Sequence, residues 1–311
     1  MNLIDFFNPK KTLKLFGLEN EFNFFKNLLL KEKLPKVLLI SGKKGSGKHT
    51  LINHLMFFFF DRENYDSNLR QIIDKNSTYL QLVENIFPNI IYLNGSDYKN
   101  AKIENIRELK KQLLKSSMSN KKRFVILDDV ECFNNNSLNA LLKIIEEPSE
   151  KNYFILINNN SKPILETIKS RCLEVKIILS NIDKEKIKTS LLDYFDQTLI
   201  LNNNSLDISP GNFLKFNYII TQQDIHLEEG YIVNLSIILD LFKKEKDINY
   251  RDLLLFLTEY YFNSIKSNKM TSYYDLIEKR SYIIKNINDF FLYNMNQKTL
   301  INSIESKLLN E

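Results

Sequence analysis

The sequence predicts an α/β fold, with a mostly parallel sheet flanked by helices, followed by an all-helical C-terminal part. Three observations predict it. Short apolar runs alternate with segments of helical periodicity over roughly the first 180 residues. After that point helical periodicity dominates and the strand signals fade. The composition is 43% hydrophobic and 26% charged over 311 residues, which suits a folded chain of about two domains.

Each expected element rests on a local pattern. Buried strands are short apolar runs that end at glycine or polar residues; they are expected at 36–41, 90–93, 123–127, 153–157 and 173–177. Amphipathic helices are expected at 19–32, 49–59, 103–114 and 137–145, with a short helix after Pro163. Later helices are expected at 253–265 and 273–291. The change of pattern predicts three domains, at 1–178, 179–242 and 243–311.

Composition excludes several classes of protein. The two cysteines, Cys132 and Cys172, are too few for a disulfide scaffold or a four-cysteine zinc site. No apolar run approaches the roughly 20 residues that span a membrane. The first residues lack a basic segment followed by an apolar one, so we expect a cytoplasmic protein. The net charge of +5 allows a nucleic-acid partner without arguing for one.

A glycine-rich segment between a strand and a helix is the first candidate site. It fits the G-x-x-x-x-G-K motif, whose backbone N–H groups and lysine bind phosphate oxygens at a helix N-terminus. The candidate nucleotide-binding residues in it are Gly42, Gly45, Ser46, Gly47 and Lys48. A plain glycine turn is the alternative interpretation.

The position after the lysine departs from the motif. Ser or Thr normally binds Mg²⁺ there, but this chain has His49, and imidazole is a poor ligand for a hard cation. Thr50 follows, but it lies about 100° further around the helix. Both remain candidate nucleotide-binding residues. We therefore expect binding of ATP and Mg²⁺ to be weak or absent.

An apolar strand ends in two carboxylates, which is the Walker B pattern. Asp128 is the candidate Mg²⁺ ligand, through a water molecule. Asp129 occupies the position of the catalytic carboxylate and is one methylene shorter than the Glu of active ATPases of this kind. A misplacement near 1 Å can lower a rate about 10²-fold. A strand capped by solvated acids is the alternative.

Three further strings resemble a known family. Residues 137–148 read SLNALLKIIEEP, residues 154–158 read FILIN and residues 167–172 read TIKSRC. Together they resemble bacterial clamp-loader AAA+ subunits, clearly over residues 1–178 and weakly beyond. The resemblance implies an AAA+ P-loop module, a small helical lid and a C-terminal helical collar domain.

The resemblance also implies roles for individual residues. Arg171 matches an arginine finger that reaches ATP in the neighbouring subunit, and its alternative is a local salt bridge. Asn158 matches a polar sensor residue at a strand end, or is simply a loop residue. Asn212 stands where a second sensor would be Arg.

The combination of a weakened nucleotide site and a retained arginine finger resembles the delta prime, or stator, type of subunit of DNA polymerase III. Its implied partners are the gamma/tau motor and delta subunits of a five-subunit ring, the sliding clamp and primed DNA, without zinc or membrane. Two rivals remain, a competent gamma/tau-like ATPase motor and a P-loop kinase. A basic stretch could contact DNA phosphates or be a solvated face; it comprises Lys110, Lys111, Lys115, Lys121, Lys122 and Arg123.

Overall fold

The computed structural model describes residues 8–96, 103–114, 122–201, 207–266 and 273–309. Its contacts divide the chain into two compact units. Unit 1 comprises Met1–Phe195 and Ser209–Phe213, and unit 2 comprises Asp196–Ile208 and Leu214–Glu311. The three expected domains stay a prediction. Among the described residues, none of the helices has the length and apolar character to cross a membrane.

Unit 1 is built on a five-stranded sheet, and the expected parallel sheet is confirmed. The strands follow the spatial order β4-β5-β6-β1-β7, and every neighbouring pair is parallel. Their bounds are β1 Val37–Gly42, β4 Ile90–Asn94, β5 Arg123–Asp128, β6 Asn152–Asn158 and β7 Leu173–Ile177. Because all five strands run the same way, their carboxyl ends meet at one edge of the sheet, where ligands bind in such folds.

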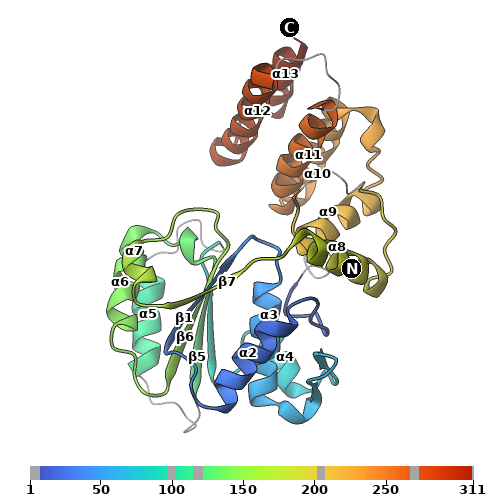
Figure 1. Ribbon diagram of the computed structural model, residues 1–311. Helices are drawn as coiled ribbons and strands as arrows, with labels where there is room; N and C mark the ends of the chain where they lie inside the picture. Colours follow the sequence, from blue (N-terminus) through green and yellow to red (C-terminus); the bar gives the residue numbers. More distant parts are fainter. Residues whose placement is uncertain (1–7, 97–102, 115–121, 202–206, 267–272, 310–311) are drawn as a thin grey trace. The chain divides into compact units, whose positions relative to one another are not determined.

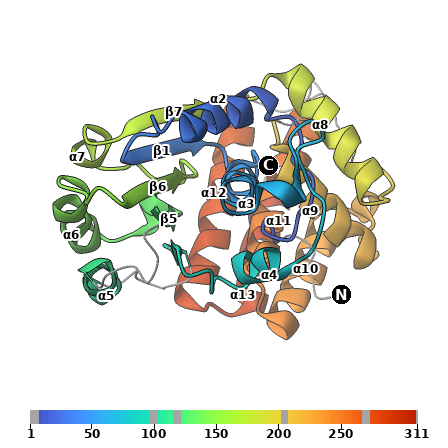
Figure 2. The same ribbon diagram turned by 90° about the horizontal axis from the view of Figure 1, so that it is seen from below.

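Helices cover both faces of this sheet (Figures 1 and 2). One face carries α2 Glu19–Leu30, α3 Lys48–Phe60 and α4 Ser77–Val83. The other carries α5 Ile103–Leu114, α6 Asn135–Ile145 and α7 Glu166–Lys169. Side chains alternate along β1, so Leu38 and Ile40 join the first hydrophobic core and Leu39 joins the second.

Residues 61–84 form elements that the sequence analysis did not anticipate. They are η1 Arg62–Asn64, the antiparallel hairpin of β2 Tyr65–Asp66 and β3 Gln71–Ile72, and α4. His54 lies beneath them, fully buried, with Nδ1 3.0 Å from the Tyr65 hydroxyl and Nε2 3.0 Å from the Thr12 carbonyl. The hairpin also bonds to the chain before α2, where Ile72 N donates to Leu13 O. These contacts hold the segment against α3 and against the chain before α2.

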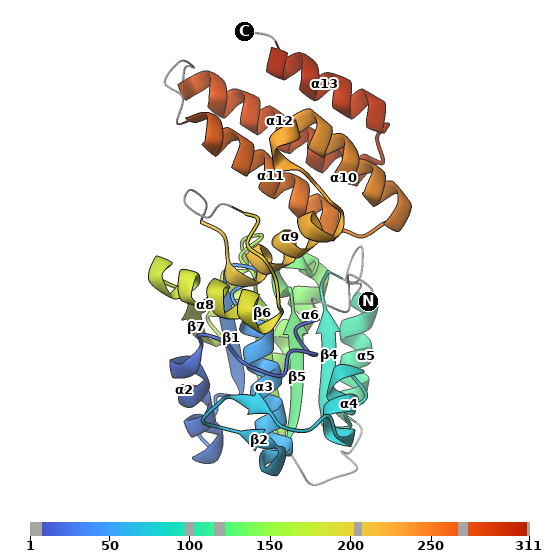
Figure 3. The same ribbon diagram turned by 90° about the vertical axis from the view of Figure 1, so that its right-hand side faces the viewer.

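The C-terminal part is helical, as expected. A further helix of unit 1, α8 Asn181–Tyr194, begins at the Ser180 cap. Helix α9 Pro210–Gln222 starts in unit 1 and continues in unit 2. Unit 2 then contains η3 Leu227–Glu229, α10 Tyr231–Glu245, α11 Asn249–Lys266, α12 Tyr273–Tyr293 and α13 Gln297–Leu309. Figure 3 shows α10 to α13 packed side by side.

One buried and one partly exposed polar contact join the helices of unit 2. The hydroxyls of Tyr231 and Thr258 lie 2.8 Å apart between α10 and α11. Arg280 on α12 donates from Nε to Glu259 Oε2 on α11, at 2.8 Å. Apolar packing also stabilises unit 2, because side chains such as Leu253 and Ile283 are fully buried.

Candidate nucleotide site

The phosphate-binding loop lies between β1 and α3, at the carboxyl edge of the sheet. Gly45 has φ +81° and Gly47, which caps α3, has φ +89°. Glycine adopts this left-handed backbone without steric cost, which explains both residues. The loop therefore has the backbone that its sequence motif predicts.

Lys48 is held inside the loop. Its ammonium donates to the carbonyls of Gly42, at 2.8 Å, and Lys43, at 2.7 Å, and lies 3.4 Å from Ser46 Oγ. Burial lowers the pKa of Lys48 to about 8, against the opposing charges of Asp128, Glu131 and Asp129. The ammonium is thus positioned before any phosphate binds, at the helix N-terminus that favours anions.

The start of α9 packs on the outside of the loop, within unit 1. Ser209 Oγ donates to the Lys44 carbonyl at 2.6 Å, and Gly211 N donates to the Gly45 carbonyl at 2.9 Å. A Cβ on Gly45 would lie 2.5 Å from Ser209 Oγ and 2.8 Å from Asn212 N. Asn212, expected at the second sensor position, therefore does lie beside the loop.

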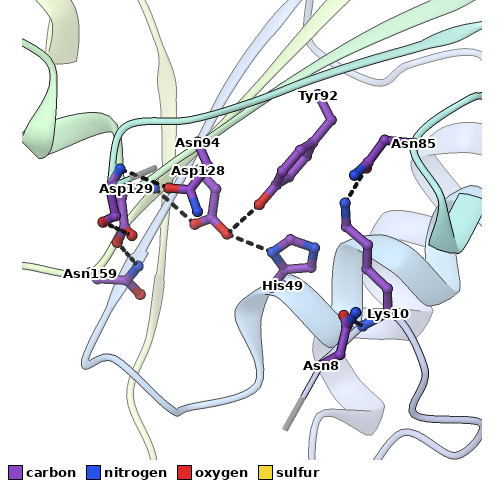
Figure 4. A network of polar contacts seen from close by, with 10 residues as sticks. Asn8, Lys10, His49, Asn85, Tyr92, Asn94, Asp128, Asp129 and Asn159 are labelled. Atoms are coloured by element: carbon purple, nitrogen blue, oxygen red, sulfur yellow. Dashed lines mark hydrogen bonds and ion pairs between the residues drawn. The ribbon is translucent and has the colours of Figure 1, made fainter. Parts of the chain in front are cut away.

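His49 is paired with the Walker B carboxylate (Figure 4). Its Nδ1 lies 2.5 Å from Asp128 Oδ2, and the side chains are 16% and 12% exposed. The Tyr92 hydroxyl donates to the same oxygen at 3.2 Å, and Asp129 N donates to Oδ1 at 2.8 Å. Burial alone would raise the pKa of Asp128, but these partners hold it below its usual value.

A cation–π contact continues this network toward the N-terminal segment. The Lys10 ammonium lies 3.5 Å from the centre of the Tyr92 ring, and the rings of Tyr92 and His49 are 5.4 Å apart. Lys10 also donates to the side chain of Asn85. Residues before α2 are therefore tied to the candidate metal position, a link that no sequence motif indicated.

These contacts test whether the site fits Mg²⁺ bound in the usual way. Mg²⁺ requires hard oxygen ligands in a near-octahedral arrangement. Here an imidazole stands at the Ser or Thr position, and it already bonds the carboxylate that would hold the cation. The phosphate loop fits a phosphate group, whereas the cation position does not fit Mg²⁺. Among the residues that the structure describes, no cluster of His, Cys, Asp and Glu could hold a metal ion.

Asp129 is also hydrogen-bonded through both of its carboxylate oxygens. It has a left-handed backbone with φ +47°. One carboxylate oxygen accepts from Asn159 Nδ2 at 2.5 Å, and the other accepts from Ser96 Oγ. Each oxygen can still accept a second hydrogen bond, so these two contacts orient the carboxylate without saturating it.

Several residues that no sequence motif indicated also shape the carboxyl edge of the sheet. Asn159 bonds Asp129, whereas its neighbour Asn158, the expected sensor, is buried and accepts from Asn160 N at 2.9 Å. Glu131 is 5% exposed and accepts from Asn159 N and Ser161 N, anchoring the loop after β6. A run of acids and asparagines at two adjacent strand ends was the available signal.

Arg171 lies at the amino ends of the strands, whereas the phosphate loop lies at their carboxyl ends. It precedes β7, whereas the phosphate loop follows the parallel strand β1, in the register Leu38↔Leu173 and Gly42↔Ile177. About 13 Å of strand separates these two levels, at roughly 3.3 Å per residue. Arg171 forms an ion pair with Glu146, with 2.6 Å between Nη2 and Oε1. The salt bridge considered as the alternative to a finger is thus present in this chain.

The basic stretch does not form one exposed surface. Arg123 is buried and donates to the Gln112 carbonyl, and Lys122 pairs with Glu32. Lys115 and Lys121 lie outside the described residues. A different basic feature is present, a groove of about 390 Å³ between α5 and α6. Its lining includes the exposed cations Arg107, Lys110 and Lys143.

Comparison with known proteins places this chain in a family. Residues 17–180 match the family model "DNA polymerase III, delta subunit". The delta prime subunit from the Buchnera aphidicola of Schizaphis graminum is 26% identical over 227 residues, which cover 67% of this chain and 68% of that protein. The gamma subunit of the same organism is 28% identical over 56% of this chain and 47% of its own length.

One further relative and one solved structure also resemble this chain. The Bacillus subtilis delta prime subunit is 30% identical over 47% of this chain and 43% of its length. Among solved structures, a DNA polymerase III gamma subunit-related protein from Thermotoga maritima has a TM-score of 0.49 at 17% identity, covering 91% of this chain and 96% of that one. The family model spans just over half of this chain. The chain therefore belongs to the DNA polymerase III delta subunit family and is a clamp-loader subunit close to the delta prime subunits.

Proposed function

We propose that this chain is the delta prime, or stator, subunit of a bacterial DNA polymerase III clamp loader. In this role it assembles with gamma/tau motor and delta subunits and helps to load the sliding clamp onto primed DNA in the cytoplasm. It supplies Arg171 to ATP bound by a neighbouring subunit and does not itself turn ATP over. The observation that carries the proposal is the pairing of His49 with Asp128 at the cation position.

Two features support a role in trans for Arg171. The residue is 36% exposed, so a partner can reach it. It also lies at the edge of the sheet away from the phosphate loop of its own chain. A guanidinium that approaches a transferring phosphoryl group stabilises its developing charge, and such fingers raise rates by about 10³- to 10⁵-fold.

Nucleotide binding without turnover fits the contacts of this chain. The N–H groups of residues 42–48 and the Lys48 ammonium would hold the phosphates, as in other loops of this kind. When ATP is bound with Mg²⁺ in a competent site, the metal neutralises charge on the phosphates. In this chain His49 takes up the carboxylate that would hold the metal, and Asp129 is bound to Ser96 and Asn159.

Contact with primed DNA is proposed for the groove between α5 and α6. Arg107, Lys110 and Lys143 contribute three cations to a concave surface, beside the amide side chains of Asn136 and Asn139. Such a surface suits the phosphate backbone, which binds cations without regard to sequence. A clamp loader needs this kind of contact because it acts at any primed site.

The alternative is a catalytically competent motor of the gamma/tau type, which the phosphate loop and the gamma relative favour. Steady-state ATP hydrolysis by the isolated chain, beside its Lys48→Ala variant, separates the two. The stator proposal predicts no turnover above that of the variant. Turnover that depends on Lys48 would reject it and identify a motor.

A further inference from the structure

All three nitrogens of the Arg171 guanidinium have a polar contact within this chain. Its Nε donates to Glu146 Oε1 at 2.9 Å, and its Nη2 forms an ion pair with the same oxygen at 2.6 Å. Its Nη1 donates to the Thr167 carbonyl at 2.9 Å and lies 3.4 Å from Ser170 Oγ. Arg171 therefore adopts a defined side-chain position before any neighbouring subunit is present.

Glu146 occupies one of the two edges through which an Arg side chain can bind a phosphate with paired N–H groups. Arg binds carboxylates and phosphates through paired N–H groups of the same planar fork. Nε and Nη2 form such a pair, and both lie close to a single oxygen of the Glu146 carboxylate. A terminal phosphate can engage this edge only by displacing the carboxylate.

The backbone around both residues is fixed, so the exchange requires only side-chain rotation. Glu146 is the C-cap of α6, and its N–H donates to the Leu142 carbonyl at 3.0 Å. Arg171 follows α7, where Ile168 is fully buried and accepts from Arg171 N at 3.1 Å. The two side chains can therefore separate while the helices stay in place.

The position of Glu146 at the C-terminal end of α6 favours an ion pair with a cation. A carboxylate at the C-terminal end of a helix faces the negative end of the helix dipole, which is unfavourable unless a positive group lies nearby. Arg171 is that group. Both side chains are partly exposed, at 36% and 46%. Ion pairs of this exposure typically change an equilibrium by about 1.5- to 5-fold, so a more highly charged anion can displace the carboxylate.

We propose that Glu146 is the competing anion that makes Arg171 selective for the triphosphate state of a neighbouring nucleotide. A terminal phosphate carries more charge than a carboxylate and displaces Glu146. When the neighbour holds a diphosphate, no γ-phosphate extends to this position, and Arg171 stays on Glu146. Glu146 is thus a positioning residue that acts through Arg171. The inference rests on the proposed role of Arg171 in trans.

The test uses the reconstituted ring of cognate motor and delta subunits with this chain as Glu146→Gln. The amide keeps the size of the side chain and removes its charge. We expect KM for ATP to fall by about 1.5- to 5-fold, with kcat and the affinity for ADP unchanged. Glu147→Gln makes the same charge change one residue away and should behave like the unchanged chain.

The Arg171→Ala variant distinguishes the proposed selectivity role of Glu146 from the proposed finger role of Arg171. If it abolishes stimulation of the ring while Glu146→Gln leaves KM unchanged, the selectivity role is wrong and the finger role stands. Equal changes in ATP and ADP affinity would also overturn the selectivity role, because they indicate a general structural effect. If Arg171→Ala changes nothing, both proposals fail. In the free chain, Glu146→Gln should shift the Arg171 Nε–H resonance, and an unchanged resonance would contradict the pairing.

Discussion

Replacing His49 by Thr should make nucleotide binding by this chain depend more strongly on magnesium. In the native chain, Asp128 Oδ2 lies 2.5 Å from His49 Nδ1, and both side chains are mostly buried. A cation that engages Asp128 in the usual way must first break this contact. The Thr hydroxyl removes the competing imidazole and supplies the hard oxygen ligand that the motif normally provides.

The size of the effect follows from that single contact. A hydrogen bond to a charged group contributes about 1.5–3 kcal/mol, which corresponds to roughly a 10- to 150-fold change in an equilibrium constant. We therefore expect Mg²⁺ to strengthen nucleotide binding at least about tenfold more in His49→Thr than in the native chain.

The assay is equilibrium binding of a fluorescent ATP analogue, measured with Mg²⁺ and with EDTA. His49→Ala is the matched control, because it removes the imidazole without adding a ligand. It should gain less magnesium dependence than His49→Thr. The reasoning is refuted if the native chain responds to Mg²⁺ as strongly as His49→Thr, or if His49→Thr shows no response.

Three further predictions concern stability and DNA binding. Burial lowers the pKa of His54 to about 4, so the unfolded state binds more protons and the free energy of unfolding falls as the pH drops from 6.5 toward 4. Urea unfolding should show a loss of about 2 kcal/mol between pH 7 and 5. This loss should be absent in His54→Gln. Gly45→Ala should destabilise unit 1 by about 3 kcal/mol, because its Cβ would meet Ser209 at a left-handed φ. Gly230→Ala, with similar φ but nothing within 4 Å, should cost less in denaturation, and equal costs would contradict the packing argument. Lys143→Ala should weaken binding to primed DNA and lower the slope of log K against log salt by about 1; an unchanged slope would place the phosphate contact elsewhere.

Much of the fold was predictable because its signals are local. The apolar run at 123–127 and the Pro-terminated helical pattern at 137–145 coincide with β5 and α6 almost residue for residue. The segment 61–84 was not predictable, because its two-residue strands are too short for a periodic pattern. They are stabilised by contacts distant in sequence, such as those of His54.

The candidate site was predictable only where its residues form a contiguous motif in the sequence. The phosphate loop is a contiguous motif, so its glycines and Lys48 could be named from the sequence. The unusual residue His49 was evident, but its partner Asp128 lies 79 positions away and the contact requires the folded sheet. The roles of Tyr92, Asn159 and Glu146 depend in the same way on side-chain geometry between separate elements.

The most direct test of the stator account is the ATP burst of the reconstituted ring with Arg171→Ala in this chain. The account predicts that the burst falls by the one nucleotide that Arg171 would contact, while ring assembly is unchanged. Lys169→Ala removes a positive charge two residues away and should leave the burst intact. A full burst with Arg171→Ala would contradict the account.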